Sequence, residues 1–341
     1  IMAYTTINKS SDYFNTKLYT GNGSNGHAIT GVGFQPDFVW IKDRDTATNH
    51  MVTDAVRGAT KTLHTQNTDV ESTAVNALSS FNTDGFTVNT DTDLNANNKK
   101  NVAWNWKANG AGSANTEGSV SATVSANTTA GFSIVQYNTA GSGTQTMGHG
   151  LDSAPTFIIT KPTQNSESWY VYIPTGVSSS LRLNTTAAAV SSTPYAGTPT
   201  DTLFSINNGV IGGYTGVISY CFTDVKGYSK FGSYTGNGNA DGPFVYTGFK
   251  PAFVMVKESS STGSWCIFDN KRLGYNPNNP RLYPNNAGAE DASETIFDIV
   301  SNGFKIRGDQ SDTNASGQTY IYAAFAEAPL VGTNNVPCTA R

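Results

Sequence analysis

Apolar residues in this chain fall in short runs that are separated by glycine, asparagine, aspartate and proline. In the first third of the chain, eight such runs predict short β-strands: KLYT, HAIT, DFVWIK, HMVTD, KTLHT, ALSSF, FTVNT and NVAWNWK. No long stretch keeps apolar residues at the i, i+3, i+4 spacing of an amphipathic helix, and TDVESTAVNAL (68–78) is the best candidate for one short helix. The pattern therefore predicts an all-β fold.

One phrase occurs three times along the chain, as PDFVWIK (36–42), PTFIITK (155–161) and PAFVMVK (251–257). The segment YTGNG at 19–23 also returns at 234–238, and the same offset of 215 residues aligns GFQPDFVWIK with GFKPAFVMVK. A middle copy is less similar in sequence but has its corresponding segments in the same order. Self-similarity at such a period is typical of tandem repeats.

The repeats divide the chain into predicted units. We expect three tandem β-sandwich or jelly-roll-like repeats at 1–108, 119–225 and 226–328. The small, polar and glycine-rich residues 109–118 are predicted to be a linker, and residues 329–341 a C-terminal docking or domain-linking tail.

The repeated strand is apolar on both of its alternating faces, since Phe38, Val39, Trp40 and Ile41 follow one another. In a half-exposed strand, apolar and polar residues would alternate along the sequence. We expect Phe38 and Trp40 to point into the core of their own repeat, and a neighbouring repeat to cover Val39 and Ile41. This predicts a compact three-lobed assembly, with pseudo-threefold symmetry as a hypothesis. A lysine ends each copy of the strand and is interpreted as a solubilising strand end: Lys42, Lys161 and Lys257.

Composition and charge exclude several partners. Only 13% of the residues are charged and the net charge is -4, so no basic face is expected for nucleic acid. No apolar run approaches the length of a membrane span, so no membrane insertion is predicted.

The start lacks the features of a signal peptide, and Met2 is the expected initiator of a protein made in the cytoplasm. The three cysteines, Cys221, Cys266 and Cys338, fit neither a disulfide framework nor a zinc site.

Motifs for catalysis are missing from the sequence. The four histidines are scattered, and no nucleophile elbow, Walker loop or dinucleotide fingerprint occurs. We predict no catalytic residues and no bound cofactor. One string, DTDLNAN, alternates Asp91, Asp93 and Asn95, and this spacing is able to turn hard oxygens toward a calcium ion. The alternative is a polar loop that caps itself by Asx turns.

Tryptophans are the other candidate site residues. Trp40, Trp104 and Trp106 lie in strand runs and are predicted core residues. Trp169 and Trp265 occupy equivalent places in the second and third copies, where the first copy has His50. Two interpretations stay open for this pair: core positions, or an exposed platform that contacts a ligand or a partner protein.

Longer phrases carry a family resemblance: GVGFQPDFVWIKDR, SFNTDGFTV, VSANTTAGFSIVQY, GHGLDSAPTFIITK, KGYSKFGSYTGNGNADGPFVYTGFKPAFVMVK and NASGQTYIYAAFAEAP. From residue 19 to residue 329 the chain resembles a family of repeat-containing virion structural proteins of tailed, mainly marine, bacteriophages; the most specific block is 227–257. The resemblance implies a non-enzymatic protein of the particle, grouped with tail, fibre or surface appendages, and brings no established catalytic residues. The middle copy departs from the pattern, so the three repeats need not share one role.

The leading hypothesis is a structural component of a phage virion, made in the host cytoplasm, exposed at the tail or fibre, and involved in host-surface attachment. Its expected partners are other copies of itself, other virion proteins and a host-surface glycan. One alternative is a capsid decoration or surface-filament subunit with no receptor role. Another is a bacterial carbohydrate-binding adhesin, and an enzyme such as a depolymerase would need paired carboxylates across a cleft.

Overall fold

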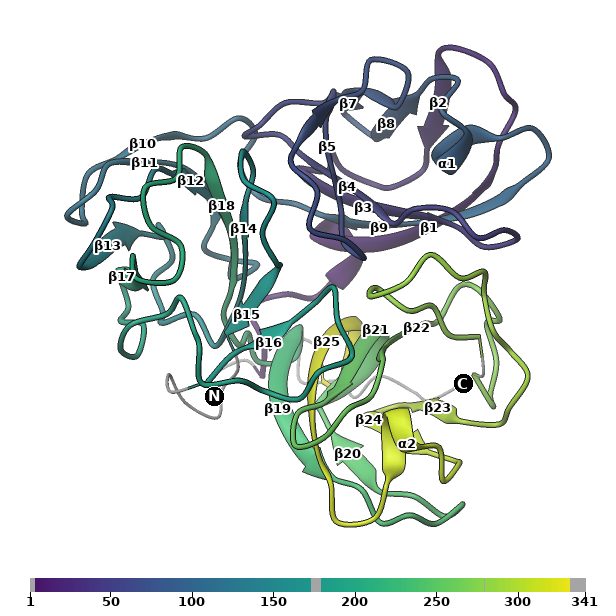
Figure 1. Ribbon diagram of the computed structural model, residues 1–341. Coiled ribbons are helices and arrows are strands. Elements are labelled where there is room, and N and C mark those ends of the chain that lie inside the picture. Colours follow the sequence, from purple (N-terminus) through teal and green to yellow (C-terminus); the bar gives the residue numbers. More distant parts are fainter. Residues whose placement is uncertain (1–3, 173–178, 279, 332–341) are drawn as a thin grey trace.

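The computed structural model describes residues 4–172, 179–278 and 280–331, which form three lobes around a common centre (Figure 1). Antiparallel β-sheets make up nearly all of the regular structure, which confirms the predicted all-β sandwich fold. The helices of the described residues are three single turns, η1 (Ser10–Asp12), α1 (Thr92–Asn95) and α2 (Ser311–Asn314), and none is long and apolar enough to cross a membrane.

The first lobe contains all eight predicted strands. Its inner sheet has the order β1 (Phe14–Thr20), β9 (Lys100–Trp106), β3 (Phe38–Asp43), β4 (Met51–Asp54), β5 (Lys61–His64) and β6 (Ser72–Thr73). Its outer sheet has the order β2 (His27–Thr30), β8 (Gly85–Val88) and β7 (Leu78–Asn82). The predicted helix at 68–78 is wrong, because this segment forms β6 and turns; its several β-branched residues favour extended backbone.

The second lobe contains a longer inner sheet, with the order β10 (Ser113–Asn115), β11 (Ala122–Asn127), β12 (Phe132–Tyr137), β18 (Val217–Phe222), β14 (Phe157–Pro162), β15 (Tyr170–Tyr172) and β16 (Leu181–Arg182). A second sheet pairs β13 (Thr144–Gly148) with β17 (Leu203–Asn207).

The predicted linker at 109–118 is wrong in part, because its centre is the edge strand β10, which pairs with β11. Gly112 makes this pairing possible. Its φ is +77°, and a Cβ there would lie 2.7 Å from the main chain of Val124.

The third lobe has an inner sheet with the order β19 (Ser229–Thr235), β25 (Thr319–Pro329), β21 (Phe249–Glu258) and β22 (Trp265–Asp269). Its outer sheet has the order β20 (Phe244–Tyr246), β24 (Gly303–Ile306) and β23 (Phe297–Val300). Most of the predicted tail at 329–341, including Cys338, lies outside the described residues.

The three inner sheets share one order of strands in their central part: β1-β9-β3-β4, β12-β18-β14-β15 and β19-β25-β21-β22. Their registers also correspond, since Trp40 faces Trp104, Ile159 faces Tyr220 and Met255 faces Ala323. These correspondences support the division into three repeats, which we keep as an interpretation.

Each inner sheet is buried on both faces, but the prediction of what covers each face is wrong. Phe38 and Trp40 point into a central cluster that all three lobes share. Val39 and Ile41 instead pack between the two sheets of their own lobe. Both faces of β3 are apolar, so the alternation of its side chains leaves open which face meets another lobe.

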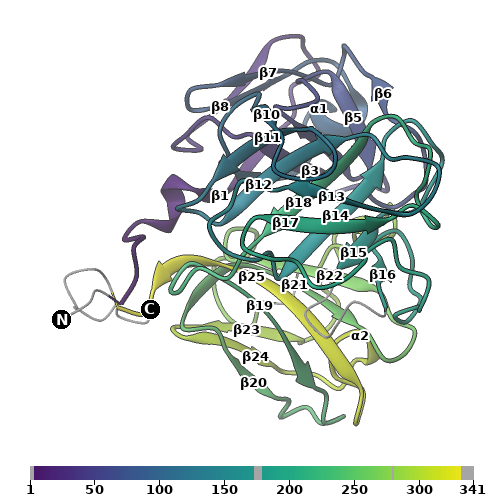
Figure 2. The same cartoon turned by 90° about the vertical axis from the view of Figure 1, so that its left-hand side faces the viewer.

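The centre of the molecule is an aromatic cluster that contains Phe38 and Trp106 of the first lobe, Phe222 of the second, and Phe253 and Phe325 of the third. A void of about 20 Å³, lined only by apolar side chains from all three lobes, remains at this centre. Figure 2 shows the start of the described chain beside the end of β25, and Thr5 and Pro329 both border Gly227. The ring of lobes is therefore closed where the described chain begins and ends.

Candidate functional site

Trp169 and Trp265, the predicted contact residues, lie between lobes and are each only 1% exposed. Trp169 Nε1 donates to the main-chain oxygen of His64 in the first lobe at 2.8 Å. Trp265 Nε1 donates to the main-chain oxygen of Arg182 in the second lobe at 2.9 Å. The interpretation as an exposed platform is wrong, because both rings are already covered by the preceding lobe.

His50 occupies the third equivalent place in this ring of contacts. Its Nδ1 accepts a hydrogen bond from Trp40 Nε1 at 3.1 Å, so the neutral tautomer carries its proton on Nε2. Burial holds the pKa of His50 well below its usual value, nearby Lys42 acts in the same direction, and the main chain of Tyr283 in the third lobe acts against them. Nε2 nevertheless reaches no partner at full hydrogen-bond geometry. Two lobes thus place a tryptophan against the preceding lobe, and the first lobe has the smaller ring of His50 at the equivalent place.

Main-chain hydrogen bonds join the lobes in the same cyclic order. The amide of Glu71 donates to Thr163 at 2.7 Å, that of Ala189 to Ser259 at 2.9 Å, and that of Glu290 to Arg44 at 2.9 Å. These bonds connect first to second, second to third, and third to first lobe. The three lobes therefore close into a ring, in which each described lobe bonds to both of the others.

The strand-end lysines, Lys42, Lys161 and Lys257, are fully buried, so their interpretation as solubilising strand ends is wrong. Lys161 Nζ donates to the Thr68 carbonyl in the first lobe at 3.1 Å, and Lys257 Nζ to the Thr186 carbonyl in the second at 3.2 Å. Burial lowers the pKa of all three ammonium groups to about 8. Two of these charges therefore connect lobes.

Two buried carboxylates also connect lobes. Asp54 pairs with Arg57 at 2.5 Å and accepts a hydrogen bond from the Tyr220 hydroxyl of the second lobe at 2.7 Å. Asp269 pairs with Arg272 at 2.6 Å and accepts from Trp104 Nε1 of the first lobe at 3.1 Å. Because protein donors inside a lobe junction surround each carboxylate, opening that junction would leave a buried charge without part of its hydrogen-bond set.

The calcium candidates Asp91, Asp93 and Asn95 each have a separate protein partner. Asp91 caps α1 by accepting from the Asp93 amide at 2.8 Å, and Asp93 accepts from Asn49 Nδ2 at 2.7 Å. Asn95 is buried, and its Nδ2 donates to the Asn89 carbonyl at 2.6 Å. Within the described ranges, no three His, Cys, Asp or Glu side chains gather as a metal site would need. The contacts are those of a self-capping loop, and calcium binding stays a prediction.

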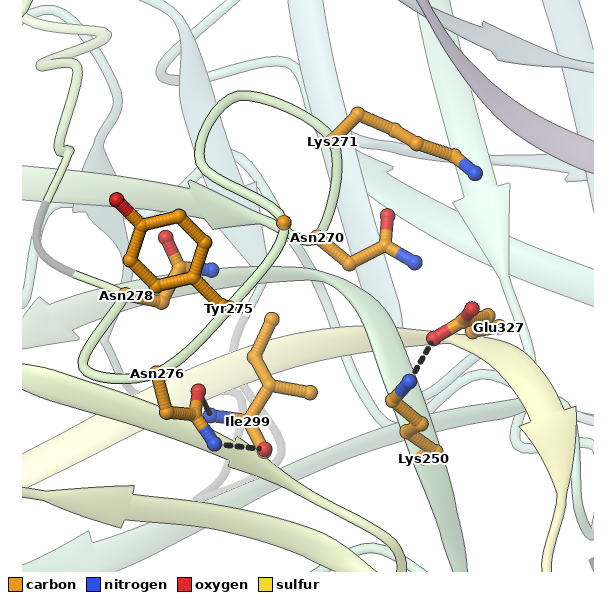
Figure 3. A pocket seen from close by; sticks show the side chains of 9 residues that line it. Lys250, Asn270, Lys271, Tyr275, Asn276, Asn278, Ile299 and Glu327 are labelled. Atoms are coloured by element: carbon orange, nitrogen blue, oxygen red, sulfur yellow. Dashed lines mark hydrogen bonds and ion pairs between the residues drawn. The ribbon is translucent and has the colours of Figure 1, made fainter. Parts of the chain in front are cut away.

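An open cavity with a volume of about 510 Å³ lies in the third lobe (Figure 3). Tyr275 and Asn276 border it on one side, and Lys250 and Glu327 on the other. Its complete lining is Lys250, Asn270, Lys271, Gly274, Tyr275, Asn276, Asn278, Ile299 and Glu327.

A loop specific to the third lobe builds one wall of this pocket. Nine residues separate Arg272 from Leu282, whereas five separate the corresponding Arg57 and Leu63 in the first lobe. The side chain of Asn276 fixes the loop by bonding both the amide and the carbonyl of Ile299, at 2.9 and 2.7 Å. Sequence reasoning missed this site, although an aromatic residue in a polar insertion that one copy alone contains was a usable signal.

An ion pair forms the opposite wall, where Lys250 Nζ lies 2.6 Å from a Glu327 carboxylate oxygen. Burial acts to raise the pKa of Glu327, but hydrogen bonds from Lys250 and Asn270 outweigh it and lower that pKa. With this pair neutralised, Lys271 leaves the lining with one net positive charge. The pocket therefore combines an aromatic ring, several amides and a modest positive charge.

Fold and site together define an all-β sandwich protein whose lobes surround a common aromatic centre, with an open polar pocket of about 510 Å³ on the third lobe. The chain belongs to the family described as Domain of unknown function (DUF7483), whose model matches residues 9–329. The match extends from just before η1 to the end of β25, so the unit of this family is the whole ring and not one lobe. Comparisons with curated proteins and with solved structures gave no significant match.

Proposed function

We propose that the chain is a non-enzymatic structural component of a tailed bacteriophage virion, exposed at the tail or fibre, where it contributes to host-surface attachment. The resemblance of residues 19–329 to virion proteins supports the assignment. The observation that carries it is the closed ring, in which buried tryptophans, lysines and carboxylates hold the lobes together.

Such a ring suits a protein that displays loops on the outside of a particle. Several of its buried charges and indole groups have their partners across lobe junctions, so opening one junction leaves charges and carbonyls without partners. The lobes are consequently expected to move as one body, and the surface loops keep fixed relative positions. A rigid display of loops serves attachment better than a chain of independently moving domains.

Cryo-electron microscopy of the native particle tests this proposal. Density for the ring at the tail or fibre, with the third lobe facing outward, is the expected result. Rings that tile the capsid or polymerise through lobe faces would replace attachment with decoration or scaffolding. Absence of the chain from purified particles would refute the virion assignment altogether.

A further inference from the structure

We propose that the pocket of the third lobe binds a saccharide, with the ring of Tyr275 as stacking platform and the lining amides as hydrogen-bond partners. The inference deepens the proposed function and rests on it for its biological meaning, because it assigns attachment to one site. Binding itself is a property of the isolated chain.

Tyr275 is exposed without a packing reason. Its side chain is 69% exposed, the highest value among the large apolar side chains of the described residues. It stands on the longer loop that the first lobe lacks, and Asn276 beside it holds that loop in place. An exposed aromatic face on a held loop, beside a concave polar surface, is an arrangement that can stack on the apolar face of a sugar ring.

Exposed aromatic rings are also confined to one lobe. Among the described residues, the large aromatic side chains with about half or more of their surface exposed are Phe244, Tyr246 and Tyr275, all in the third lobe. The registers of β20 and β2 align Phe244 and Tyr246 with Ala28 and Thr30 of the first lobe. The third lobe thus differs from the first in the chemistry of its surface as well as in loop length.

Amide oxygens of the lining lack protein partners. Asn278 is 2% exposed, and its Nδ2 donates to the Asp269 carbonyl at 2.7 Å, which fixes the direction of Oδ1. The Oδ1 atoms of Asn278 and Asn270 accept no hydrogen bond within the described chain. Both oxygens are covered in the free chain, so donation from a sugar hydroxyl group requires a movement of the pocket wall; Figure 3 shows Asn270 between Tyr275 and Glu327.

Charge selects among saccharides. Lys250 is neutralised by Glu327 at 2.6 Å, so Lys271 is the lining residue that adds a positive charge. The whole chain has a net charge of -4, so this positive site stands out locally. A saccharide that carries a carboxylate or sulfate group should therefore bind more tightly than its neutral analogue.

The test uses the purified chain on an array of defined oligosaccharides that are neutral, uronate-containing, sialylated or sulfated. The strongest binder is then titrated by calorimetry. Tyr275→Ala is expected to weaken binding about tenfold or more, and Tyr275→Phe to retain it. Lys271→Gln should reduce affinity for acidic glycans and flatten the salt dependence. Tyr246→Ala is the matched control, because it removes an exposed tyrosine of the same lobe outside the pocket.

No binding to any array member, or binding that Tyr275→Ala leaves unchanged while Tyr246→Ala weakens it, would overturn the proposal. An unchanged melting temperature shows that Tyr275→Ala is folded. The two proposals fail separately: a chain that occupies tail tips but binds no saccharide loses this site alone, whereas a chain that binds saccharide but is absent from particles loses the virion assignment.

Discussion

Replacing Phe253 by alanine tests whether the centre makes the three lobes one cooperative unit. The Phe253 ring is 1% exposed and packs against Phe14, Trp104 and Trp106 of the first lobe. Removing a buried phenylalanine side chain costs about 3–5 kcal/mol. Because the new cavity would join the existing void of about 20 Å³, we expect a loss in the upper half of that range.

Two buried thiols allow the lobes to be followed separately. Cys221 lies in the second lobe and Cys266 in the third; both are fully buried, and burial raises the pKa of each thiol. Each therefore reacts with a thiol reagent only when its own lobe opens. The experiment uses a Cys338→Ser background. When each lobe closes again faster than the reagent reacts, the labelling rate of its thiol gives the free energy of opening for that lobe.

We expect Phe253→Ala to lower the opening free energy at both thiols by the same amount. The matched control is Phe244→Ala, which truncates a phenylalanine that is 49% exposed in the same lobe and should change neither rate by more than about 0.5 kcal/mol. Faster labelling of Cys266 with unchanged labelling of Cys221 would refute the argument, because it would show that the third lobe opens alone.

The other predictions concern the lobe junctions and the loop of α1. Trp169→Phe should lower the free energy of unfolding by about 1–3 kcal/mol in urea titrations, because the His64 carbonyl loses its donor; no change would mean that water replaces the indole. Asp269→Asn should cost about 3 kcal/mol, because Arg272 loses its fully buried counter-ion and keeps only the partly exposed Glu290, at 3.1 Å, and an unmoved urea midpoint would contradict this. The three strand-end lysines have a pKa of about 8 in the folded chain, below the value of 10.5 for the free side chain. At a pH between these two pKa values, the unfolded chain therefore binds more protons than the folded chain. Their contribution to stability should therefore rise as pH increases from about 8 to 10, and replacing Lys161 by methionine should reduce that rise. Chelation by EDTA should leave the melting temperature unchanged if the string DTDLNAN is only a self-capping loop, and a large decrease would establish a bound cation.

Strand positions were predictable because the local pattern determines them. The eight apolar runs of the first lobe match β1–β5 and β7–β9 within a few residues, and the missed β6 has only two residues. Which face of each strand packs against another lobe was not predictable in the same way. Both faces of β3 are apolar, so periodicity shows that Trp40 and Val39 are buried but not which of them meets another lobe.

The burial of the strand-end lysines and the position of the pocket could not be predicted from the local sequence pattern. A lysine at a strand end usually meets water, and only the fold reveals that Lys161 ends against a carbonyl 93 residues away. Trp169 was assigned correctly by its core interpretation, but its partner lies in another lobe. The pocket depends on a loop that brings Tyr275 beside strands β21, β23 and β25, and such long-range proximity is absent from local sequence.

The corresponding positions Trp104, Tyr220 and Ala323 all point into the centre, yet they differ greatly in size. In an assembly of three identical subunits, one gene would have to place the same side chain at all three positions. Covalent linkage removes that constraint, because a large residue in one lobe can be offset by a small one in another. The side chains at the centre can therefore change in one lobe at a time, as long as their summed volume is conserved. Each lobe is also free to acquire surface chemistry of its own.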